Sequence, residues 1–250
     1  MEKRIIFGVA FFSIIAISVV VGFIFQPRYK QETLTTVRSG DEHIVKVDVE
    51  LGNGFLVIVK NDTGKSWRVT AKYGETSKGP DIEVKDSDAG KTLEVDLGNG
   101  ILYIEIQDLS ELVFDVDNGH TTLIFMNMTL NISGTVSNGN FKLVAFGGNY
   151  SLDVNIANGN ADLRATDTRN LTGEIDVTNG EIDLTLLTDS GGKIEYSVTN
   201  GLAYVFEGSF QKDENETDTG VNGTLTRSGN EIDFNMSLMN GEIVIVVVEG

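Results

Sequence analysis

The amino-acid sequence predicts an all-β protein: a single-stranded β-solenoid, with coils of about 20 residues, that follows one N-terminal transmembrane helix. Three observations predict this fold. The dipeptide Asn-Gly recurs at near-constant spacing, aliphatic residues keep fixed positions on both sides of it, and nothing after the N-terminal apolar run shows a helical 3.6-residue pattern. The 28 glycines against 2 prolines fit a chain with many turns that need positive φ.

The N-terminal element is an uncharged run of 21 residues, 5–25. As a helix it would rise about 30 Å, which is the thickness of a bilayer's hydrocarbon core. Lys3 and Arg4 precede the run and favour a cytoplasmic N-terminus, although Arg28 and Lys30 follow it closely. A cleaved signal peptide is the alternative, but its apolar region would be shorter and would end in small residues. We therefore expect an uncleaved anchor.

The chain then divides into three parts: a transmembrane anchor over residues 1–25, a polar tether over 26–41, and a β-repeat domain over 42–250. This organisation predicts a single-pass protein of the cell membrane with its C-terminal domain outside the cytoplasm. The bilayer, contacted through residues 5–25, is its first expected partner.

The repeat is marked by Asn-Gly, which occurs nine times in the β-repeat domain. The asparagines are Asn53, Asn99, Asn118, Asn138, Asn158, Asn179, Asn200, Asn222 and Asn240. From the second of these onward, the spacings are 19, 20, 20, 21, 21, 22 and 18 residues. The longer gap after Asn53 predicts one degenerate coil, turning near Lys78 and Gly79. Ten coils stacked at about 4.8 Å would make a rod on the order of 50 Å long.

Two aliphatic columns flank the dipeptide in eight of the nine units. Two residues before the asparagine stand Leu51, Leu97, Val116, Val136, Ile156, Val177, Val198 and Leu238. Five residues after it stand Ile58, Ile104, Leu123, Leu143, Leu163, Leu184, Val205 and Ile245. The unit at Asn222 departs from the pattern, with Gly220 and Arg227 in these positions. Alternation around each column indicates strands with one buried face.

Two folds satisfy this pattern. In a β-solenoid each unit is one coil, and the aliphatic columns stack as ladders. In an antiparallel β-meander each Asn-Gly would supply the two positive-φ residues of a type I′ hairpin. The near-constant unit length favours the solenoid, because stacked coils must match in length whereas hairpins need not.

The segment Val-Thr-Asn-Gly-Glu-Ile-Asp-Leu at 177–184, echoed at 198–205 and 238–245, resembles the DUF4097 family, also called adhesin-like or toast-rack proteins. The resemblance covers roughly residues 44–250. It implies a short-period β-solenoid outside a membrane segment, and surface binding rather than catalysis. It brings no catalytic residues with it.

Composition excludes several kinds of chemistry. The chain has no cysteine, so disulfides, thiolate metal sites and cysteine nucleophiles are absent. Its only histidines are His43 and His120, which leaves few candidates for a hydrolase triad. The formal net charge of −18 repels phosphate backbones, so a nucleic-acid partner is not expected.

Eight Asn-x-Ser/Thr sequons make the chain a candidate glycoprotein. They begin at Asn61, Asn127, Asn131, Asn149, Asn170, Asn215, Asn222 and Asn235. The first five follow an Asn-Gly by 8–13 residues, near the opposite corner of a coil. The alternative is an unmodified Asn- and Thr-rich β surface.

Three further candidates are acidic or aromatic. An outward column holds Glu50, Asp96, Asp115, Asn155 and Asp176. Water and salt could screen this column, or Ca²⁺ could bind its oxygens, although no calcium-binding motif is present. Glu181 and Asp183 are the kind of carboxylate pair that a glycoside hydrolase uses. Trp67 is expected to cap the first coils.

The function favoured by the sequence is a non-enzymatic, membrane-anchored cell-surface protein used in adhesion or in envelope scaffolding and binding, with an envelope protein or a glycan as its partner. One alternative is a carbohydrate-active β-helix enzyme. Another is a subunit of an envelope-stress sensor. We expect no catalytic residue, no bound cofactor and no metal site.

Overall fold

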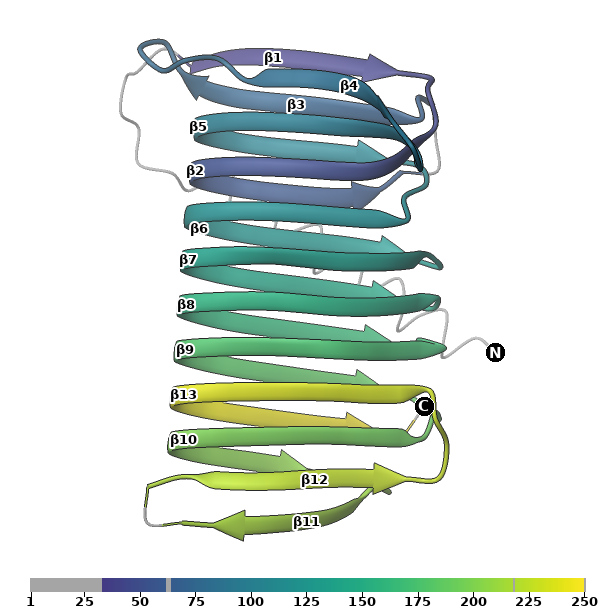
Figure 1. The fold of residues 1–250 in the computed structure, drawn as a ribbon, viewed down its shortest axis with the longest axis vertical. Coiled ribbons are helices and arrows are strands. Elements are labelled where there is room, and N and C mark those ends of the chain that lie inside the picture. The colour runs from purple at the N-terminus through teal and green to yellow at the C-terminus, as the bar shows by residue number, and fades with distance from the viewer. Residues whose placement is uncertain (1–32, 62–63, 218, 250) are drawn as a thin grey trace, which may run out of the picture. The chain divides into compact units, whose positions relative to one another are not determined.

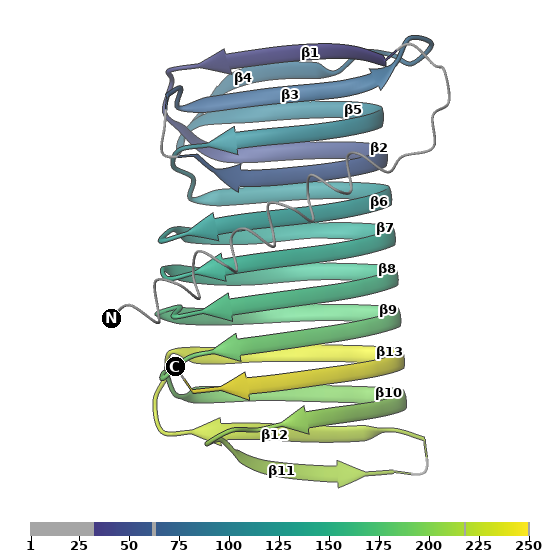
Figure 2. The ribbon, with the colours of Figure 1, turned by 180° about the vertical axis from the view of Figure 1, so that it is seen from behind.

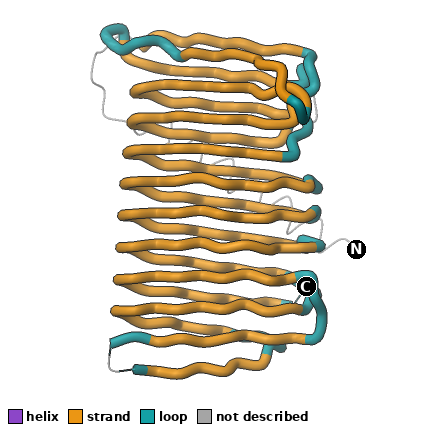
Figure 3. Tube along the Cα trace, viewed as in Figure 1, coloured by secondary structure: helices purple, strands orange, loops and turns teal. Residues whose placement is uncertain are grey.

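Eight long strands, each folded in its middle at Asn-Gly, form the body of the domain in the computed structural model (Figure 1). The structure describes residues 33–61, 64–217 and 219–249, and these residues contain strands and short turns but no helix (Figure 3). Within this part of the chain, no helix is long and apolar enough to cross a membrane. The predicted anchor, residues 5–25, lies outside the described residues.

Each folded strand is one coil. The coils are β2 (Ile44–Lys60), β5 (Gly90–Ile106), β6 (Glu111–Met126), β7 (Thr129–Phe146), β8 (Asn149–Thr166), β9 (Asn170–Leu187), β10 (Gly192–Phe206) and β13 (Ile232–Val248). Neighbouring coils pair in parallel with asparagine beside asparagine, as Asn118 beside Asn138 and Asn138 beside Asn158. Parallel pairing confirms the solenoid and excludes the antiparallel meander.

We call the half of a coil before Asn-Gly its first arm and the half after it its second arm. The two arms form two facing layers, joined at the Asn-Gly corners on the left of Figure 1. The corners do not have the two positive-φ residues that a type I′ hairpin in the meander alternative would need. In most coils the glycine alone has positive φ, for example 150° at Gly139. We call the turns that connect one coil to the next, opposite the Asn-Gly corners, the far turns. The only described non-glycine residues with positive φ, Asn127 and Asp167, lie at these far turns.

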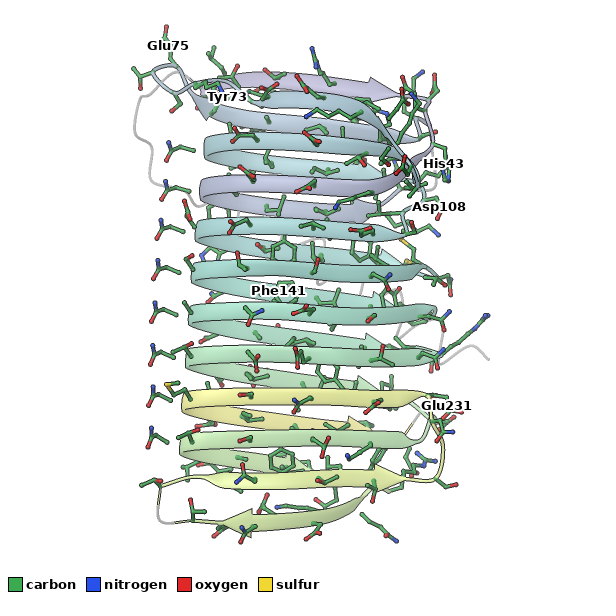
Figure 4. The ribbon with its side chains drawn as sticks, in the orientation of Figure 1. His43, Tyr73, Glu75, Asp108, Phe141 and Glu231 are labelled. Carbon is green, nitrogen blue, oxygen red and sulfur yellow. The ribbon has the colours of Figure 1, made fainter. Side chains whose placement is uncertain are left out.

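The apolar core fills the space between the two layers. Both predicted aliphatic columns point into it, and Val177 and Leu184 are only 2% and 1% exposed. Phe141 lies between the layers and stacks on Phe114, with ring centroids 5.6 Å apart (Figure 4). In the second column Val205 of β10 is the exception, since it is only partly buried.

The coils do not stack in the order of the sequence. The strand order is β1-β3-β5-β2-β6-β7-β8-β9-β13-β10-β12-β11, and β4 pairs with β5. The first coil, β2, therefore lies between β5 and β6, and the last, β13, lies between β9 and β10. The described residues form eight coils rather than the ten expected.

One end of the stack is capped by β1 (Thr33–Gly40), β3 (Trp67–Gly74) and β4 (Asp81–Ser87). Strand β1 lies within the segment expected to be a tether, 26–41, and is part of the sheet because it pairs with β3. Strand β4 pairs antiparallel with the first arm of β5, and β3 pairs antiparallel with its second arm. The degenerate coil expected in this segment is therefore absent. Trp67 is the cap residue that was predicted: it is 6% exposed, and its Nε1 donates to Glu42 Oε2 at 3.1 Å.

The other end carries β12 (Val221–Arg227) and β11 (Gln211–Glu216). Strand β12 pairs antiparallel with the first arm of β10, and β11 pairs with β12. Asn222 and Gly223 therefore lie within a straight capping strand and form no coil corner. The sequence departs from the aliphatic columns at this unit because it is not a coil.

Candidate binding surfaces

The outer faces of the two layers and the two rows of turns display the polar residues singled out from the sequence. Alternation along each arm sends every second side chain outward, and the parallel register stacks outward residues of successive coils into columns. Each sequence-predicted site residue can therefore be assigned to a column or to an end of the stack.

The acidic column is continuous only near the end capped by β4. Asp96 pairs with Asp81 on one side and Glu50 on the other, and Glu50 pairs with Asp115. Thr135 comes next and its hydroxyl donates to Asp115. Asn155 and Asp176 follow beyond this threonine. We call the four adjacent carboxylates, Asp81, Asp96, Glu50 and Asp115, the acidic ladder.

An open groove of about 350 Å³ runs beside the acidic ladder. Its lining is Asp48, Glu50, Asp81, Glu83, Lys85, Glu94, Val95 and Asp96. Two lysines partly neutralise this face. Lys85 contacts Glu94 and lies 3.4 Å from Glu83, and Lys46 lies 3.0 Å from Glu111. Hydrogen bonds to Glu94 and Glu111, respectively, raise the pKa of Lys85 and of Lys46, and the surrounding carboxylates add to both shifts.

The structure does not gather the acidic residues into an evident metal site. No group of three or more histidine or carboxylate side chains arranged to hold a metal ion occurs among the described residues. The acidic ladder is a row on an exposed face, in which neighbouring carboxylates come from paired strands. The nearby Lys85 pairs with Glu83 and Glu94, which are not part of the ladder.

Glu181 and Asp183 lie on the outer side of the second arm of β9. Burial raises the pKa of Asp183, and the charges of Asp162 and Glu242 add to the shift. Burial also raises the pKa of Glu181, with contributions from Asp183 and Glu242. The two carboxyls thus belong to an acidic cluster on a layer surface, and Arg164 and Lys142 offset it through ion pairs with Asp162.

The two histidines are not brought together. His43 precedes β2 and lies 3.7 Å from Asp108, at the edge of far turns (Figure 4). His120 follows an Asn-Gly corner, and its ring stacks on Phe55 with centroids 5.1 Å apart. The two histidines thus lie at separate surface positions, His43 beside the exposed Asp108 and His120 beside Phe55.

The Asn-Gly corners place a row of amide side chains along one side of the stack. Most of these amides donate an Nδ2 hydrogen to the Oδ1 of a neighbouring asparagine, at 3.0 Å from Asn138 to Asn118, 3.1 Å from Asn158 to Asn138 and 2.9 Å from Asn179 to Asn158. The row continues through Asn240 to Asn200. We call it the asparagine ladder. It explains why asparagine, and not another turn residue, precedes each corner glycine.

The sequon asparagines fall into three settings. Asn61 follows β2, and Asn127, Asn149 and Asn170 lie at or beside the far turns, as predicted. The amides of the last two are engaged, since Asn170 donates to Asn149 at 2.8 Å and Asn149 donates to Thr129 at 3.0 Å. The others are exposed on strands: Asn131 in β7, Asn215 in β11, Asn222 in β12 and Asn235 in β13. Glycosylation of any of them stays a prediction.

Sequence reasoning missed one surface, the outer side of the second arm of β10. Leu202, Tyr204 and Phe206 are 58%, 45% and 61% exposed. The signal was present in the sequence, because alternation places these three side chains outward, where Asn160, Asp162 and Arg164 stand in β8. The same columns also hold apolar residues in other coils, including Val244 and Val246 of β13, but β10 is the last coil of the stack. Three large exposed apolar side chains on the last coil mark an end or a contact.

No protein-family model matches the chain, and no curated protein matches it either. Among solved structures, the fold is similar to that of a "putative cell adhesion protein" from Clostridium sporogenes, with 16% identity and a TM-score of 0.54 over 87% of this chain and all of that one. A "putative adhesin" from Bacteroides fragilis aligns over 87% of this chain and 98% of that one, with 14% identity and a TM-score of 0.38. The first of these likenesses shows a shared fold.

Proposed function

We propose that the chain is a non-enzymatic, membrane-anchored cell-surface protein whose β-solenoid binds other molecules at the cell envelope, in adhesion or scaffolding. The observation that carries the proposal is the stack itself. Seven of the eight coils are paired on both sides along nearly their whole length, β10 is paired on both sides in its first arm, and the side chains of all eight close one continuous core. Such a stack is stiff and offers long, regular outer faces, which suits display and binding.

Two further features support the proposal. The fold is shared with a protein described as a putative cell adhesion protein. The DUF4097 resemblance fits the same role and remains part of the proposal.

The proposal is tested with the full chain, tagged at its C-terminus, in cells that lack it. The tag should fractionate with membranes and be removed by protease added outside. Cells carrying the chain should adhere to surfaces coated with envelope extract or glycans more strongly than cells carrying the core variant Val177→Asp, which should fail to fold because Val177 is buried.

The alternative, a carbohydrate-active enzyme, predicts a different result. Glycan hydrolysis by the purified chain, lost in both Glu181→Gln and Asp183→Asn, would overturn the non-enzymatic assignment. These carboxyls lie on an open surface with raised pKa values, so the two variants should fold and make a direct comparison possible.

A further inference from the structure

One strand edge of the stack lacks a partner. The first arm of β10 pairs with β12 over residues 192–198, and both arms of β10 pair with β13. Within the part of the chain that the structure describes, no strand pairs with residues 202–206 on the side away from β13. At the opposite end the corresponding edge, residues 101–106 of β5, is covered by β3. The two ends of the solenoid are therefore capped unequally (Figure 2).

The uncovered edge is apolar on both of its faces. Leu202, Tyr204 and Phe206 point outward and are exposed. The inward residues Ala203 and Val205 are only partly buried, whereas their neighbours in β13, Ile243 and Ile245, are fully buried. Edge strands are normally protected by charge, proline or short length. Two other edge strands, β4 and β11, are rich in charged residues, but residues 202–206 carry no charge and no proline.

We propose that this edge binds an extended segment of another protein, which adds to β10 as an antiparallel strand and completes the last coil. Strand addition to a sheet edge is a common mode of peptide recognition: backbone hydrogen bonds supply affinity and alternate side chains supply specificity. The added strand would lie on β10 as β3 lies on β5.

Strand β3 shows what kind of segment fits such an edge. Trp67, Val69 and Ala71 point inward and are buried, while Arg68 and Lys72 alternate with them. Arg68 lies 3.8 Å from Glu105 of the strand that it covers. A segment that alternates apolar with basic or hydroxyl side chains therefore satisfies an edge of this shape.

Charge around the β10 edge selects a basic segment. Glu207 directly follows the apolar triplet, and Glu242 of β13 pairs with Leu202. The capping strand β11 adds Glu214 and Glu216 on the side of the sheet that Tyr196 and Val221 also face, with Lys212 on the same side 2.8 Å from Glu214. With a net charge of −18 on the chain, a segment carrying arginine or lysine is attracted and an acidic one is repelled.

A single strand fits this edge better than a second copy of the chain. Beyond β10 the first-arm layer continues through β12 and β11, whereas the second-arm layer ends at β10. The second-arm layer is therefore shorter than the first-arm layer at this end, and the unpaired edge of β10 is recessed relative to β12 and β11. A second stack approaching it would meet β12 and β11 before its own strand reached β10, and its charge of −18 would oppose the approach.

The test uses the full chain in mild detergent and, as probe, a fluorescent synthetic peptide with the sequence of residues 66–73, Ser-Trp-Arg-Val-Thr-Ala-Lys-Tyr. We expect saturable binding in the micromolar range, because a five-residue edge buries a small interface. Tyr204→Lys should weaken binding at least tenfold through repulsion. Thr122→Lys should not, since Thr122 occupies the same column in β6, which is paired on both sides.

The position of the bound peptide can be tested by cross-linking two introduced cysteines, because the chain has no cysteine of its own that would react. Thr70 pairs with Tyr103 of β5, and Tyr103 occupies the same column as Tyr204. With an added oxidant, oxidised glutathione, to accept the two electrons, a peptide with cysteine in place of Thr70 should therefore form a disulfide with Tyr204→Cys, since directly opposed residues have Cα atoms about 5 Å apart. The variant Thr122→Cys should give no more than background.

Three results would overturn the proposal: no peptide binding, equal binding by Tyr204→Lys and Thr122→Lys, or equal cross-linking at positions 204 and 122. Self-association of the full chain that is lost in Tyr204→Lys would identify a second copy as the occupant, and would also overturn it. The inference rests on the proposed binding role. The peptide-binding test requires neither the membrane anchor nor exposure at the cell surface. The proposed strand addition and the proposed cell-surface function can therefore be contradicted separately.

Discussion

At each Asn-Gly corner, the glycine serves the close approach of neighbouring coils. A Cβ on Gly139 would lie 1.6 Å from the carbonyl oxygen of Gly119, and one on Gly159 would lie 1.5 Å from that of Gly139. Positive φ and contact with the next backbone both exclude a side chain there. The corner glycine is therefore required by stacking as much as by the bend.

Gly139→Ala should accordingly destabilise the domain by about 3 kcal/mol or more, because positive φ and a backbone clash add together. Gly98→Ala is the matched control: Gly98 stands directly before Asn99, has no positive φ, and no atom lies within 4 Å of its Cβ position. It should change stability by less than about 0.5 kcal/mol. Chemical denaturation measures both, and equal losses would show that stacking does not select the glycine.

The carboxyl of Asp183 should make stability depend on pH. Its pKa is raised above the ordinary value of 3.8 by burial and by Asp162, so the folded chain holds this proton more tightly than the unfolded chain. The associated stability is present at low pH and is lost as pH rises through the folded pKa.

Asp183→Asn removes this penalty and should raise Tm at pH 7. The advantage over the unsubstituted chain should shrink on acidification and vanish once pH falls below the ordinary aspartate pKa of 3.8. Asp153→Asn, which removes an exposed carboxylate from the first arm of β8, controls for the loss of one charge. An advantage that is constant with pH, or shared by the control, would contradict the assignment.

At the scale of elements, the asparagine ladder ties the corners of successive coils together. The amide of Asn158 donates to Asn138 at 3.1 Å and accepts from Asn179 at 2.9 Å. Asn158→Ala removes both bonds and should cost about 1–2 kcal/mol, since each contributes about 0.5–1.5 kcal/mol. Asn155→Ala, an exposed change in the same coil, should cost less than about 0.5 kcal/mol in the same thermal melts. Similar losses would mean that the ladder is only a consequence of the fold.

The elements themselves were predictable from the sequence, but their order was not. Columns such as Val177 and Leu184 identify strands, buried faces and coil length, because burial and alternation are local properties of the chain. The columns are alike in every coil, so Leu51 can stack on Val116 as well as on Leu97. Nothing local then dictates that β2 lies between β5 and β6, or that β13 lies between β9 and β10.

The candidate site was less predictable than the elements. The alternation of apolar and polar residues along each strand predicted that Glu50, Asp96 and Asp115 point outward. That Glu50 lies between Asp96 and Asp115 depends on the unexpected placement of β2 between β5 and β6. Likewise, the exposure of Tyr204 depends on β12 covering only the first arm of β10. Both properties depend on which strands lie next to each other in the stack, and the repeated sequence pattern does not determine that order.

Over the whole molecule, the charge of −18 is unevenly placed. The acidic ladder puts like charges opposite each other on paired strands, which is destabilising. At the other end of the stack, acidic Asp233 instead has Lys193 and Thr172 as its cross-strand neighbours. Screening should therefore matter most at the end capped by β4.

Low salt should lower Tm, and about 0.15 M NaCl should restore most of the loss, because the Debye length then falls to about 8 Å. Asp96→Asn should reduce this salt dependence, since its neighbours are Glu50 and Asp81. Asp233→Asn should leave it nearly unchanged. At matched ionic strength, Ca²⁺ and Mg²⁺ should act alike, because a row of carboxylates without a metal-ligand cluster in the described residues screens nonspecifically. A larger gain with Ca²⁺, abolished by Asp96→Asn, would mean that the ladder binds calcium, since only a ligand specific for the folded state adds stability by mass action.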